Sequence, residues 1–103
     1  MVDYKKYFER IYIEEIDKLE EANEYFEKRN LSLRAMIDLV KSHKAQNLSL
    51  INQAIEERNE EEVYNILNRS KDYVAEMRRV LYSSIKDFFG EDSINDLKRK
   101  YGN

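Results

Sequence analysis

The chain of 103 residues contains no cysteine and no proline, and it has only two glycines and one histidine. Without cysteine, a disulfide scaffold, a thiolate metal site and a cysteine nucleophile are all excluded. The scarcity of proline and glycine argues against a turn-rich β fold and suits long helices. The single histidine excludes a paired Glu-x-x-His di-iron site and argues against zinc. We therefore expect no metal and no cofactor.

Long apolar runs are also missing, because none exceeds three residues. No segment is then apolar enough to span a membrane, and Met1–Lys5 has no signal-peptide core. We expect a cytoplasmic protein. The chain carries 18 basic and 21 acidic residues, for a formal net charge of −3. With both signs mixed along the chain there is no broad basic face, which argues against nucleic acid as the main partner.

What the sequence does contain is apolar residues at helical spacing in three long stretches. The first helix is predicted to run from about residue 3 to 29, with Asp3 as its N-cap. The second is predicted from Ser32, its expected N-cap, to about residue 58. The third is predicted from about residue 60 to 89, with Asn59 as N-cap and Gly90 just beyond its end.

Three helices of nearly equal length joined by tight turns predict an all-α fold: an up-down-up antiparallel three-helix bundle. We expect one domain over residues 1–103, completed by a short C-terminal fourth helix that begins at Ser93. In this arrangement the first and third helices run parallel, offset by roughly 58 residues. Tyr12 is then level with Ser70, and Phe26 with Ser84. The expected core line of the third helix contains Val63, Leu67, Ser70, Val74, Met77, Leu81, Ser84 and Phe88.

A polar layer is predicted to interrupt the apolar core near the middle of the bundle. Glu15 and Lys44 each fall inside an otherwise apolar arc, and the midpoints of equal helices lie side by side. Since an unpaired buried charge costs several kcal/mol, we expect these two to form an ion pair. Such a pair fixes the register of the helices; alternatively, it lines a small-ligand or catalytic site. The candidate residues of the polar layer are Glu15, His43, Lys44, Asn47 and Tyr73.

The second helix also has an apolar face wider than one core requires. Leu39 and Leu50 lie at its outer edge with His43 between them, and we expect this edge to be the seam of an antiparallel homodimer. Tyr64 and Tyr82 fall well off the core line of the third helix and mark a second candidate partner surface. The candidate interface therefore comprises Leu39, His43, Leu50, Tyr64 and Tyr82.

These features favour a non-enzymatic protein-interaction module: a small adaptor, chaperone or regulator that binds a protein partner or itself. Two alternatives stay open. The polar layer is the candidate for a small-molecule or catalytic site. The basic segment Lys98-Arg99-Lys100 is the candidate for association with nucleic acid, although a basic C-terminal turn also complements its own helix dipole.

Overall fold

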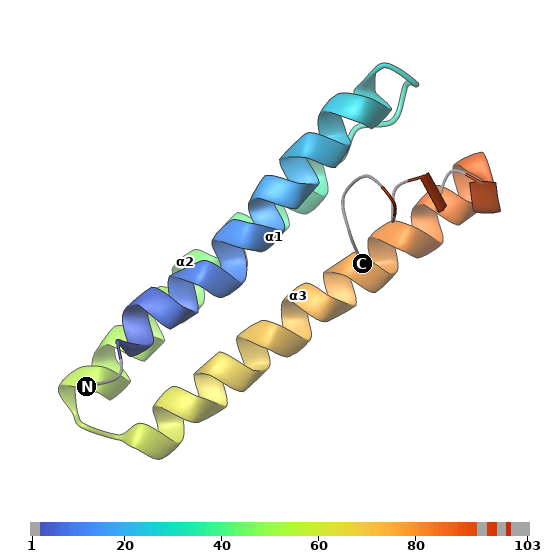
Figure 1. Ribbon diagram of the computed structural model, residues 1–103. Coiled ribbons are helices and arrows are strands. Elements are labelled where there is room, and N and C mark those ends of the chain that lie inside the picture. Colours follow the sequence, from blue (N-terminus) through green and yellow to red (C-terminus); the bar gives the residue numbers. More distant parts are fainter. Residues whose placement is uncertain (1–2, 93–94, 97–98, 100–103) are drawn as a thin grey trace.

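The computed structural model describes residues 3–92, 95–96 and 99, and the elements that it defines are three α-helices (Figure 1). They are α1 (Tyr4–Glu27), α2 (Arg34–Glu56) and α3 (Glu60–Phe89). The described part of the chain contains no strand. The all-helical prediction is confirmed, and the bounds of α3 agree with those expected. α1 and α2 end two residues earlier than predicted.

The helix ends show why the helices begin and stop where they do. The Asp3 side chain accepts a hydrogen bond from the backbone N–H of Lys6, at 3.0 Å, and so caps α1. Asn59 caps α3 in the same way, accepting from the N–H of Glu62 at 3.2 Å. At the other end of α3, Gly90 has a φ of 86°, a conformation that glycine adopts at little cost. All three end signals were predicted.

The two interhelical turns share one backbone motif. In the first turn the Leu31 N–H donates to the Phe26 carbonyl, and Asn30 has a φ of 64°. In the second turn the Asn59 N–H donates to the Ala54 carbonyl, and Arg58 has a φ of 55°. A six-to-one bond around a left-handed residue is the Schellman motif, which satisfies carbonyls at a helix end.

The predicted N-cap of the second helix was wrong. Leu33, not Ser32, occupies the cap position of α2, and it makes no side-chain cap bond. The Ser32 hydroxyl accepts only from the N–H of Arg34, at 3.2 Å.

Each helix packs against the other two, and the molecule measures 47 × 20 × 19 Å. The chain reverses at each turn, so that α1 and α3 point the same way (Figure 1). Contacts between α1 and α3 follow this direction: Tyr12 meets Ser70, 58 residues later. The predicted register of Tyr12 against Ser70 is therefore confirmed. Between α1 and α2 the order is reversed, since Glu20 pairs with Lys41 and Asn23 with Leu33.

The core runs the length of the bundle. Its fully buried side chains come from all three helices and include Phe8, Tyr12, Phe26, Ile37, Val40, Ile51, Ile66 and Ile85. Phe88 was predicted to belong to this core, but it is 72% exposed. Phe88 follows Ile85 and precedes Phe89 on the last turn of α3, which lies level with the last turn of α1. There Phe89 turns to Phe26 instead, with ring centroids 5.5 Å apart.

The predicted fourth helix stays a prediction, because most of that segment (93–94, 97–98 and 100–103) lies outside the described residues. The pairing of Phe26 with Ser84 is likewise untested. Among the described residues, no helix combines the length and apolarity needed to cross a membrane.

Candidate functional site: a polar layer and the outer edge of α2

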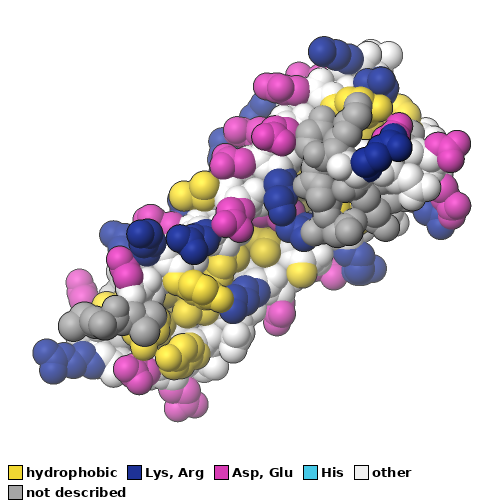
Figure 2. All heavy atoms as spheres, viewed as in Figure 1, with side chains coloured by type: hydrophobic (Ala, Val, Ile, Leu, Met, Phe, Trp, Pro, Cys, Tyr) yellow, Lys and Arg dark blue, Asp and Glu magenta, His cyan; other side chains and the backbone are white. Residues whose placement is uncertain are grey.

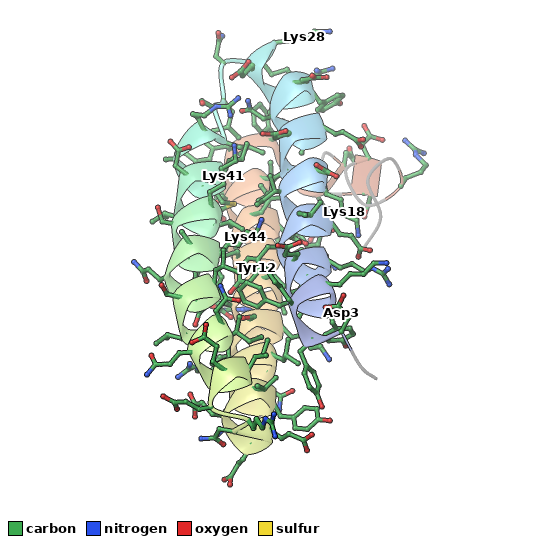
Figure 3. The ribbon with its side chains drawn as sticks, turned by 90° about the vertical axis from the view of Figure 1, so that its left-hand side faces the viewer. Asp3, Tyr12, Lys18, Lys28, Lys41 and Lys44 are labelled. Carbon is green, nitrogen blue, oxygen red and sulfur yellow. The ribbon has the colours of Figure 1, made fainter. Side chains whose placement is uncertain are left out.

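Tyr12 is the centre of the polar layer. It is fully buried, and it reaches from α1 into the space between the helices (Figure 3). Its hydroxyl lies 2.7 Å from His43 Nδ1 on α2 and 2.9 Å from Ser70 Oγ on α3. One hydroxyl thus links all three helices. Burial raises the pKa of Tyr12, and the Ser70 hydrogen bond partly opposes that rise.

The contacts around Tyr12 fix where the protons lie. Ser70 Oγ is 2.8 Å from the carbonyl of Ile66, which can only accept, so the serine proton goes there. Ser70 then accepts from Tyr12, and Tyr12 in turn accepts from His43. This is the one arrangement that places a proton in all three contacts. It requires a proton on His43 Nδ1, which leaves the lone pair of the neutral ring on Nε2.

The imidazole of His43 is held on both faces. The ring of Tyr73 stacks on it at 3.6 Å between centroids and 4° between planes. The amide nitrogen of Asn47 lies 3.1 Å from Nδ1 and 3.4 Å from Nε2, and it also donates to the His43 carbonyl at 3.0 Å. A nitrogen close to both ring nitrogens must lie over the ring face, so it occupies the side opposite Tyr73. His43 as a whole is partly exposed.

The surroundings favour the neutral form of His43. Burial among Tyr12, Asn47 and Tyr73 lowers the pKa of its imidazole below the ordinary value of 6.5. The positive charge of Arg69 lowers it further. Burial also raises the pKa of the Tyr73 phenol. At neutral pH the polar layer is therefore an uncharged hydrogen-bonded cluster.

Glu15 is buried as predicted, at 3% exposure, but the predicted partner was wrong. Its Oε2 lies 2.5 Å from Nη2 of Arg78 on α3, and Lys44 makes no ion pair with it. The hydrogen bond to Glu15 raises the pKa of Arg78 above its already high value. Lys44 is half-buried on α2. The helical periodicity of the sequence predicts which face of its own helix carries a charged residue. It does not predict which neighbouring helix that face contacts.

The structure therefore brings together three of the five predicted polar-layer residues: His43, Asn47 and Tyr73. Tyr12 and Ser70 complete the cluster, and sequence reasoning missed their role in it. The sequence did contain a signal for both residues. The predicted offset of 58 residues between the first and third helices already put the Tyr12 hydroxyl level with the Ser70 hydroxyl.

The polar layer is closed on itself. Among the described residues, no buried side-chain nitrogen or oxygen lacks a hydrogen-bond partner. Two surface hollows of about 320 and 240 Å³ lie at the end of the bundle near the α2–α3 turn, on either side of Tyr4. Neither is lined by a polar-layer residue. No group of three or more histidine, aspartate or glutamate side chains in the described part of the chain could hold a metal.

The outer edge of α2 is apolar and open. Leu39 and Leu50 are 58% and 46% exposed, and His43 lies between them with partial exposure. The other predicted surface is different. Tyr82 packs against the core, and half-exposed Tyr64 packs edge-on against Tyr4 at 5.7 Å. The hydrogen bond to Tyr64 raises the pKa of Tyr4 to about 12. Tyr4 and Tyr64 thus contribute to the contact between α1 and α3.

Hydrophobic side chains also gather on the face shown in Figure 2, over the half of the bundle near the α2–α3 turn, with basic side chains beside them.

Of the basic segment Lys98-Arg99-Lys100, only Arg99 lies among the described residues, where it pairs with Asp96.

Comparison with protein-family profiles, curated proteins and solved structures finds no match to this chain. The fold and the site define a small three-helix protein with a closed polar layer and one apolar helix edge.

Proposed function

We propose that this chain is a non-enzymatic protein-interaction module, an adaptor, chaperone or regulator built as an up-down-up bundle, and that it self-associates through α2. The observation that carries the proposal is the exposure of Leu39 and Leu50. Burying a leucine side chain stabilises an association by roughly 1.5–3 kcal/mol, so an edge with two of them favours being covered.

These leucines are additional to what the bundle core needs. α2 already buries Ile37, Val40 and Ile51 completely against its neighbours. A helix that served only one core would carry polar residues on its remaining surface. The excess apolar edge supports a second contact, and a copy of the same chain is the partner present wherever the protein is made.

The polar layer supports a structural role for its residues more than a binding role. Its buried side-chain nitrogens and oxygens all have hydrogen-bond partners, and neither of the two hollows is lined by its residues. A ligand would have to replace contacts that the fold already makes, at a cost of roughly 1–3 kcal/mol for each polar group left unpaired. We propose that the Tyr12–His43–Ser70 cluster sets the register of the three helices.

The test is the double variant Leu39→Glu with Leu50→Glu. We expect it to stay helical by circular dichroism and to sediment more slowly than the parent chain, because paired carboxylates cannot be buried at a seam. The matched control is Ile13→Glu, which alters an apolar side chain of α1 that is 43% exposed. This control should sediment like the parent. An unchanged sedimentation coefficient in the double variant would refute self-association through this edge.

A further inference from the structure

The exposed edge of α2 carries no charge. Its residues, here named the α2 stripe, are Ala35, Leu39, Ser42, His43, Gln46, Leu50 and Gln53. All are exposed except His43, which is partly exposed. In a chain that is 38% charged, seven consecutive positions of one helix face without an acidic or basic residue stand out. The charged residues of α2 fall off the stripe at 100° per residue: Lys41 lies on the far side, and Asp38 and Glu56 lie on one flank, 100° from Leu39.

An uncharged stripe suits contact with a second copy of itself. In an isologous contact both copies bury the same surface, so a charge on the stripe would be desolvated in both copies, with no opposite charge on the stripe to pair with it. Burying an unpaired charge is destabilising. The absence of charge avoids this cost over about 27 Å of helix, at 1.5 Å per residue.

The spacing of the stripe is symmetric about its centre. From Leu39 the next positions follow at intervals of four, three and four residues: His43, Gln46 and Leu50. A two-fold axis between Lys44 and Ala45 would set Leu39 level with Leu50 of the second copy, and His43 level with Gln46. In a parallel pairing Leu39 would instead meet Leu39, and His43 would meet His43.

The hydrogen-bonding groups favour the antiparallel register. The bonds from Nδ1 to Tyr12 and onward to Ser70 leave the lone pair on Nε2 of the partly exposed His43, with the Asn47 amide nitrogen 3.4 Å from it. The Gln46 side chain carries an amide N–H₂ donor. In the antiparallel register this donor faces an acceptor twice, once on each side of the axis. In a parallel register the two acceptor nitrogens face each other.

We propose that the α2 stripe binds the α2 stripe of a second copy in antiparallel orientation, with leucines at both ends and His43–Gln46 hydrogen bonds in the middle. This inference rests on the proposed self-association, and it adds the orientation, the register and the polar contact at the axis. The hydrogen bonds of the polar layer fix the tautomer of His43. They thereby make Nε2 the acceptor for Gln46 of the second copy.

Cysteine cross-linking tests the register, and the chain offers a clean background because it has no cysteine of its own. In the antiparallel register the two Leu39 positions are 11 residues apart along the seam, about 16 Å, which exceeds the roughly 7 Å reach of a disulfide. Leu39→Cys alone and Leu50→Cys alone should therefore stay monomeric on a non-reducing gel after oxidation. The double variant Leu39→Cys with Leu50→Cys should become a closed covalent dimer.

Ile13→Cys, at an exposed position on α1, sets the background from random collision. If each single variant cross-links as well as the double, the pairing is parallel and the inference is wrong, while self-association stands. If no variant exceeds background although reduced protein sediments as a dimer, the seam lies elsewhere and the inference is also wrong. If the reduced parent chain sediments as a monomer, the proposed function itself fails.

Discussion

Glu15 shows what a helical wheel can and cannot predict about a single residue. Its place inside an apolar arc predicted burial, and it is buried. Its partner depends on how the helices are rotated against each other, which the wheel does not contain. Arg78 lies four residues after Val74 and seven before Ile85, on the apolar line of α3, so a signal for its inward position was present. Lys44 was chosen as the partner because it lies at the same height along the bundle as Glu15. Equal height does not decide which neighbouring helix a side chain faces.

The first prediction concerns this ion pair. Arg78→Leu should lower the free energy of unfolding by about 2–4 kcal/mol, because it leaves the buried Glu15 carboxylate without its partner. The double change Glu15→Leu with Arg78→Leu should recover much of that loss. Lys44→Leu is the control and should leave stability unchanged or slightly higher. Urea unfolding measures all of these values. A neutral Arg78→Leu would show that the pair contributes nothing.

The second prediction concerns His43. Since its pKa in the folded chain is lowered, the stability that neutral His43 contributes is complete above about pH 6.5, the unfolded value. It is lost as the pH falls below 6.5 towards the folded pKa, because the unfolded chain takes up a proton that the folded chain resists. Because His43 is the only histidine, its imidazole signals can be followed in an NMR titration without overlap from another histidine. A midpoint below 6.5 is expected, and a midpoint above 6.5 would contradict the burial of this ring.

At the scale of elements, the helix ends were the most predictable feature. The caps Asp3 and Asn59 and the terminal Gly90 follow from local chemistry, and each was confirmed. The start of α2 was mispredicted because its capping bond comes from another helix. Oδ1 of buried Asn23 on α1 accepts from the Leu33 N–H at 2.7 Å. A cap that comes from another helix cannot be predicted from the residues next to the helix end.

This tertiary cap gives the third prediction. Asn23→Ala should cost about 1–3 kcal/mol in unfolding free energy, because the buried Leu33 N–H loses its acceptor. Asn65→Ala, at an exposed position inside α3, is the matched control and should be neutral or slightly stabilising. Thermal or urea unfolding compares them. Equal stabilities for the two variants would mean that the N–H finds another partner at no cost.

The fourth prediction concerns the turn between α2 and α3. Arg58 holds a φ of 55°, which costs roughly 1 kcal/mol for a residue with a Cβ atom. Arg58→Gly should therefore raise the stability by about 0.5–1 kcal/mol. The same substitution at exposed Arg10, within α1, should lower it by about 1 kcal/mol. A loss of stability in Arg58→Gly would show that the Arg58 side chain makes contacts worth more than the strain.

At the scale of the whole molecule, the sequence predicted the helices and the parallel register of α1 with α3. It did so because four-and-three spacing and capping residues are local, and equal lengths leave few ways to pack. The composition of the polar layer was predicted only in part, since a buried hydroxyl such as that of Tyr12 looks apolar on a wheel. The exposure of Leu39 and Leu50 could be anticipated from the excess width of the α2 face.

Self-association through α2 is the central claim, and the mass of the unmodified chain in solution tests it most directly. Sedimentation equilibrium over a dilution series should give an average mass approaching twice the chain mass of 12.5 kDa at high concentration, falling to 12.5 kDa on dilution. The Leu39→Glu, Leu50→Glu variant, run alongside, should remain at 12.5 kDa throughout. A parent chain that stays at 12.5 kDa at every concentration would contradict the claim.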